Sequence, residues 1–72
     1  MEQPSKKILD ILKKEYPIGT RVKLLYMDDA QAPPKFTEGT VLGVDDIGSL
    51  LMAWDNGTHL NVLYNCDIVQ KI

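Results

Sequence analysis

The dipeptide Asn56-Gly57, which lies between two apolar runs, is the feature that most constrains this chain. Both residues accept a positive φ at low cost, and Asn-Gly in this setting is the strongest short-range sign of a β-hairpin. Around it, residues 39–62 (GTVLGVDDIGSLLMAWDNGTHLNV) predict three short strands joined by two tight turns. We therefore take residues 39–62 as the centre of the predicted sheet and place the other segments relative to it.

The register of this hairpin decides where Trp54 lies. A two-residue turn at Asn56-Gly57 would leave Trp54 in an exposed apolar patch, which would itself indicate a docking surface. A three-residue loop with Gly57 left-handed instead pairs Trp54 with Thr58 and turns the indole inward. We favour the three-residue loop because it buries larger side chains, each worth roughly 1.5–3 kcal/mol. The inward set is then Leu50, Met52, Trp54, Leu60 and Val62.

The flanking segments add two strands. Alternation places Val22, Leu24 and Tyr26 on one face of the first strand. Gly39 and Gly43 indicate a bulge or sharp bend in the second strand, as closure of a small barrel requires. The expected strands cover residues 20–26, 38–45, 49–54, 58–64 and 68–72.

Residues 5–15 predict one short amphipathic helix, with Ser5 as its N-cap. Pro17 ends it, because proline lacks a backbone donor and restricts the preceding residue. A helix of about three turns is marginal alone. We therefore expect it to dock on its own sheet, or else on a second copy or another partner. The apolar side chains available for this are Ile8, Leu9, Ile11 and Leu12.

The composition limits how the fold is reinforced. A chain of 72 residues allows one domain and buries only about 60% of its unfolded surface. Cys66 is the only cysteine and His59 the only histidine, which excludes an internal disulfide and a structural zinc site. Self-association is the remaining common reinforcement, so a homo-oligomer through the helix or a sheet edge is expected. Asp10 and Lys13 interrupt the N-terminal apolar residues, so we expect a cytoplasmic protein with no membrane segment.

Four segments carry a resemblance to known proteins: residues 16–22 (YPIGTRV), 38–41 (EGTV), 44–50 (VDDIGSL) and 54–57 (WDNG). The glycine-bounded strands look like those of a small SH3-like β-barrel. More narrowly, the segments resemble one small prokaryotic family that is known only as a domain of unknown function and is often met on phages and conjugative elements. The resemblance covers residues 16–72 and implies no catalytic residue. The expected fold is mainly β: an SH3-like five-stranded barrel in residues 16–72, preceded by one short N-terminal amphipathic α-helix in residues 1–15.

Catalysis is poorly supported by the residues present. His59 would have to serve every role in a nucleophilic or general-base mechanism. Cys66 lies next to Asp67, which disfavours a thiolate, and we expect a small residue that is at least half-buried. The aspartate pairs lack the spacing of a calcium loop, and the glycines form no phosphate-binding motif. We therefore expect no enzyme, no cofactor and no metal site.

The charge distribution argues against nucleic acid as a partner. The net charge of −2 divides into +1 for residues 1–15 and −3 for residues 16–72. Residues 16–72, with their net negative charge, lack the excess of Lys and Arg on which binding to a phosphate backbone relies. Tyr26, Phe36 and Trp54 could nevertheless stack on bases.

Two functional hypotheses remain. The first is a non-catalytic binding or adaptor module, encoded on a phage or mobile element, that contacts a protein partner through the long loop of residues 27–37 or a sheet edge. The second is a protein that sequesters a small-molecule or nucleotide defence signal, with a basic pocket between subunits. Candidate binding residues are Tyr26, Asp28, Asp29, Lys35, Phe36, Arg21, Lys23 and His59.

Overall fold

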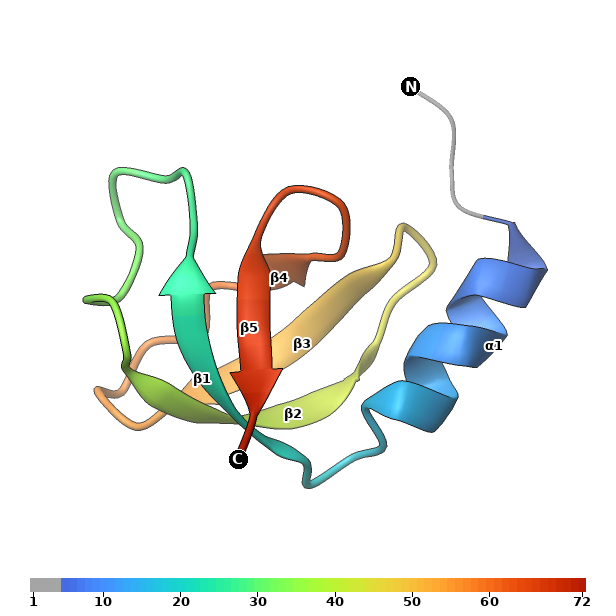
Figure 1. Cartoon of the computed structure of the whole chain (residues 1–72), viewed down its shortest axis with the longest axis horizontal. Helices are drawn as coiled ribbons and strands as arrows, with labels where there is room; N and C mark the ends of the chain where they lie inside the picture. Colours follow the sequence, from blue (N-terminus) through green and yellow to red (C-terminus); the bar gives the residue numbers. More distant parts are fainter. Residues whose placement is uncertain (1–4) are drawn as a thin grey trace.

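A computed structural model of the chain describes residues 5–72, and residues 1–4 of the expected helical segment lie outside them (Figure 1). One helix precedes five strands that form an antiparallel sheet in the order β4-β3-β2-β1-β5. The mainly β class, the five strands and the N-terminal helix are confirmed. The elements are α1 (Lys6–Glu15), β1 (Arg21–Tyr26), β2 (Glu38–Val44), β3 (Ser49–Trp54), β4 (Val62–Leu63) and β5 (Ile68–Lys71).

The hairpin after β3 has the three-residue loop that was favoured. The Trp54 N–H donates to the Thr58 carbonyl over 2.9 Å, and Gly57 has a φ of 91°. This left-handed glycine lets the loop close while both strands keep their twist. Trp54 is 3% exposed, so the indole lies in the core.

Strand β4 is much shorter than the expected 58–64, because side chains replace part of the β3–β4 ladder. The Met52 N–H points to Asn61 Oδ1 over 3.4 Å, and the Leu60 carbonyl accepts a 2.8 Å hydrogen bond from Trp54 Nε1. Since these groups are satisfied without a regular strand, residues 58–61 leave the sheet. Leu60 is only half-buried there.

The core is small and lies on one face of the curved sheet. Tyr26 does not belong to it: a register shift between Leu24 and Tyr26 in the β1–β5 pairing turns this side chain outward, and it is 52% exposed. The prediction that Tyr26 shares one face of the strand with Val22 and Leu24 was therefore wrong. The buried apolar residues are Val22, Leu24, Val41, Leu50, Met52, Trp54 and Val62.

The sheet bends but does not close. The β2–β3 register shifts between Val41 and Gly43, where the sequence predicted a bulge. Figure 1 shows β2 and β3 crossing behind β1 and β5. The edge strands β4 and β5 are not paired with one another, so the described residues form an open sheet rather than the closed barrel that was expected.

Helix α1 lies beside the sheet, next to β2, and is loosely held (Figure 1). The Ser5 hydroxyl caps it by accepting from the Ile8 N–H over 3.3 Å, as predicted. Lys71 ties its C-terminal end to β5, because Nζ lies 2.9 Å from Glu15 Oε2 and 5.1 Å from the Tyr16 ring. No residue of α1 is buried. Within residues 5–72, no helix has the length and apolar character needed to cross a membrane.

Candidate functional site

Phe36 is the most unusual residue of the long loop. Its φ is 75°, and no other non-glycine residue between 5 and 72 has a positive φ. The Thr37 N–H donates to the Pro34 carbonyl over 3.0 Å, which closes a tight turn with Phe36 at its third position. Glycine or asparagine normally occupies that position when φ is positive. Phe36 is nevertheless 57% exposed to solvent.

Two lysines flank this ring. Lys35 Nζ lies 5.0 Å from the ring centroid and Lys23 Nζ lies 5.7 Å from it, both within cation–π range. Lys35 comes from the loop and Lys23 from β1, so the fold brings them together. In the part of the chain that the structure describes, neither ammonium forms an ion pair. We call Phe36, Lys23 and Lys35 the Phe36 platform.

Tyr26 extends the area around the platform. It lines a shallow pocket of about 190 Å³ that also contains Met27, Pro33 and Lys35. Lys35 is therefore near both exposed aromatic residues, since it lies beside the Phe36 ring and lines this pocket together with Tyr26. Four of the predicted binding residues, Tyr26, Lys35, Phe36 and Lys23, share this region.

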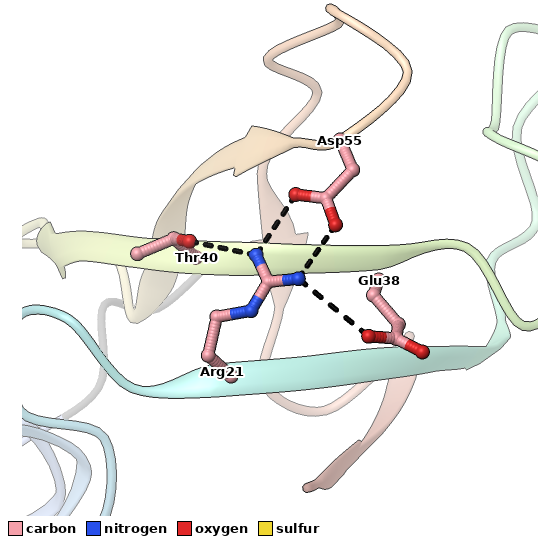
Figure 2. Close-up of polar contacts among 4 residues, drawn as sticks. All are labelled: Arg21, Glu38, Thr40 and Asp55. Carbon is pink, nitrogen blue, oxygen red and sulfur yellow. Dashed lines mark hydrogen bonds and ion pairs between the residues drawn. The ribbon is translucent and has the colours of Figure 1, made fainter.

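Arg21 is placed differently, because its guanidinium is already occupied (Figure 2). Both terminal nitrogens bond the Asp55 carboxylate, one of them over 2.8 Å to Oδ1. The same group donates to Thr40 Oγ1 over 2.9 Å and lies 3.5 Å from Glu38 Oε1. The network links β1, β2 and the loop after β3 on the outer face of the sheet. An anionic ligand at Arg21 would have to displace Asp55.

This network predicts how stability depends on pH. Hydrogen bonding to Arg21 lowers the pKa of Asp55 below its ordinary value of 3.8, and the same contact raises the pKa of Arg21. A lowered carboxyl pKa contributes stability above the unfolded-state pKa, and that contribution is lost as the pH falls through the folded-state pKa. In urea unfolding, the difference between the wild type and Asp55→Asn should therefore be full at neutral pH and should shrink as the pH falls below about 4. An unchanged difference down to the lowest pH would contradict this assignment.

The other predicted residues lie apart from the platform. Asp29 Oδ1 accepts from the Gln31 N–H over 2.8 Å and so shapes the loop. Asp28 and Asp29 line a groove of about 460 Å³ that also contains Cys66 and Asp67. Cys66 is exposed, contrary to expectation. His59 is exposed in the segment before β4. Among residues 5–72 no set of three or more His, Cys, Asp or Glu residues is placed to hold a metal ion.

Sequence reasoning missed the partners of Arg21 and the backbone of Phe36. Asp55 lies 34 positions from Arg21, and its place within the hairpin loop gave no sign of a long-range pair. For Phe36 no local signal was present, because Pro34 occupies the first position of this turn and not the second position that proline favours. The sequence did identify Phe36 and both lysines as candidates, but not that they meet.

The fold defines a small, mainly β protein with an open five-stranded antiparallel sheet and an N-terminal helix. The chain belongs to the family described as Domain of unknown function (DUF4314), which matches residues 5–72. The match includes α1, so the resemblance extends beyond the residues 16–72 on which it was first based. No curated protein and no solved structure matches the chain.

Proposed function

We propose that this protein is a non-catalytic binding module that acts through protein–protein contact, with the Phe36 platform as its contact surface. The observation that carries the proposal is the combination of strain and exposure at Phe36. A left-handed backbone costs an L-residue roughly 1–2 kcal/mol, and an exposed ring recovers little of that through burial. Backbone strain that is not offset by burial of the same side chain is typical of binding sites.

The chemistry of the platform favours an acidic segment of a partner protein. Aromatic side chains are common energetic centres of protein interfaces. The two ammonium groups beside Phe36 have no carboxylate partner within the described residues and would attract negative charge. Residues 16–72 carry a net charge of −3, which would repel an extended polyanion such as nucleic acid. The two lysines of the platform therefore favour binding of a short acidic segment over binding of a long polyanion.

A ligand-sequestering function is the second candidate, as an anti-defence protein of a phage or mobile element. It draws on the same feature, since an aromatic ring with two free ammonium groups also suits a nucleotide base and its phosphates. The adjoining pocket of about 190 Å³ is smaller than typical small-molecule sites. Arg21 is already paired with Asp55 and adds no free charge. These points favour the protein-binding role.

Phe36→Gly and Phe36→Ala separate strain from function. Both remove the ring, but only glycine accepts the φ of 75° freely. Phe36→Gly should be more stable than Phe36→Ala by about 1 kcal/mol in urea unfolding. Equal stabilities would show that the backbone at this position is not strained.

The binding role is tested by affinity capture from lysate of the source organism, followed by mass spectrometry. The wild type should retain a partner that Phe36→Gly loses, and a combined Lys23→Gln and Lys35→Gln variant should hold it less well. Raised salt should also weaken capture, because exposed charge pairs are screened. Ile18→Ser changes an exposed apolar residue outside the platform and serves as the matched control. Equal capture by the wild type and Phe36→Gly would refute the platform as the contact surface.

A further inference from the structure

Strand β5 (Ile68–Lys71) is an open edge of the sheet (Figure 1). It pairs with β1 on one side, and within residues 5–72 no strand pairs with its other side. It contains no proline, and its single charged residue is Lys71. Unprotected edges of this kind are templates for pairing with another chain.

The hydrogen bonds of β1 show which backbone groups of β5 are free. The Leu24 N–H donates to the Thr37 carbonyl over 2.9 Å, and the Leu24 carbonyl accepts from the Phe36 N–H over 2.7 Å. Both groups therefore point away from β5. Val69, which lies opposite Leu24, occupies a non-hydrogen-bonded position, so its own N–H and C=O point to the free side.

The alternation along β5 adds a second free residue. Lys71 lies two positions beyond Val69 and has the same orientation, since strand geometry repeats every second residue. The alternate residues face β1: the Ile72 N–H, one position beyond Lys71, donates to the Arg21 carbonyl over 3.1 Å. Gln70, two positions before Ile72 and opposite Lys23, has the same orientation toward β1. The open edge thus presents two N–H and C=O sets at the spacing that an added antiparallel strand would use.

A mainly apolar groove of about 280 Å³ adjoins this edge. Leu12 and Tyr16 of α1 contribute to its lining, as do Ile68 and Val69 of β5 itself. Asp67 is the only charged residue of the lining. The remaining lining residues are Leu50, Val62 and Tyr64.

We propose that β5 and this groove bind an extended, basic segment of a partner protein by strand addition. The segment hydrogen-bonds to the backbone of Val69 and Lys71, and its inward side chains are apolar and enter the groove. Its flanking basic residues complement Asp67, the only charged residue of the groove lining, and the net charge of −2 of the chain. None of these groups belongs to the Phe36 platform, so this proposal does not depend on the first.

The test is selection of displayed random peptides against the full chain. The selected peptides should alternate apolar and polar residues and be rich in Lys or Arg. Val69→Pro removes the outward N–H and should weaken their binding about tenfold. Val69→Ala loses a similar part of the side chain but keeps the donor, and should bind within about twofold of the wild type, since an exposed backbone N–H is unaffected. Phe36→Gly should bind as the wild type does.

Amide hydrogen exchange on the wild type gives a second readout that needs no variant to fold. The Val69 and Lys71 amides should exchange quickly in the free protein and become protected when a selected peptide is added. Failure to enrich peptides, equal binding by Val69→Pro and Val69→Ala, or unchanged exchange at both amides would overturn the proposal. A concentration-dependent dimer that protects the same amides without peptide would also overturn it, and would assign the edge to a second copy.

Discussion

Replacing Trp54 with alanine is expected to remove most of the stability of this protein. The indole is 3% exposed and is the largest side chain in a core of seven buried apolar residues. Truncating a buried Trp costs roughly 3–5 kcal/mol through lost burial and the cavity left behind. A domain of 72 residues has a total stability of roughly 4–11 kcal/mol at typical values per residue. Trp54→Ala should therefore be partly or wholly unfolded at room temperature.

The matched control for this prediction is Trp54→Phe. It keeps an aromatic ring in the core but removes Nε1, leaving the Leu60 carbonyl without the 2.8 Å hydrogen bond that it accepts. We expect a loss of about 1–3 kcal/mol, smaller than that of Trp54→Ala. Urea unfolding should be followed by circular dichroism, because Trp54 is the only tryptophan and both variants lose its fluorescence. Equal unfolding midpoints for the wild type and Trp54→Ala would contradict the central place of the indole in the core.

The hairpin around Trp54 is the part of the fold that the sequence specifies most firmly. Several local signals agree there: a turn dipeptide, alternating apolar residues, and the gain from burying large side chains. The limits of β3 and of the loop 27–37 follow from the same kind of agreement. The length of strand β4 could not be predicted, because its shortening depends on the Asn61 side chain replacing a backbone partner. The periodicity of apolar residues shows which side chains share a face, but not which side chains hydrogen-bond to the backbone in place of a paired strand.

For the candidate binding surfaces, the sequence indicated which residues take part but not how they are arranged in space. Lys23, Lys35 and Phe36 could be named from the sequence because they are charged or aromatic residues on or next to a long loop. Their convergence could not be predicted, because it depends on the left-handed turn at Phe36 and on the path of β1. The free edge of β5 depends in the same way on the sheet remaining open, a property of tertiary pairing that no local pattern reports.

The second large effect is expected at Gly39, which is buried in β2 opposite Trp54. A Cβ added there would lie 2.6 Å from Trp54 Cε3 and 3.1 Å from the Ala53 carbonyl oxygen. The first distance is shorter than any normal carbon–carbon contact, and the second constrains the backbone that would have to move. Overpacking of a core typically costs 1–3 kcal/mol and at times more. We expect Gly39→Ala to lose about 3 kcal/mol in urea unfolding.

A double-mutant cycle with Trp54→Leu tests whether the indole is the cause. Leucine has no six-membered ring at this place, so the added methyl group of Gly39→Ala should cost less in that background than in the wild type. Residues in direct contact commonly show coupling of about 0.5–3 kcal/mol, whereas independent sites add within about 0.5 kcal/mol. Coupling in that range, with the sign of a relieved clash, would establish that β2 carries glycine at this position so that the indole can lie against its backbone. Additive losses would instead assign the cost to the other close neighbours, the Ala53 carbonyl oxygen and Met52 Cε, each 3.1 Å from the added Cβ. No loss at all for Gly39→Ala would refute the packing described for this core.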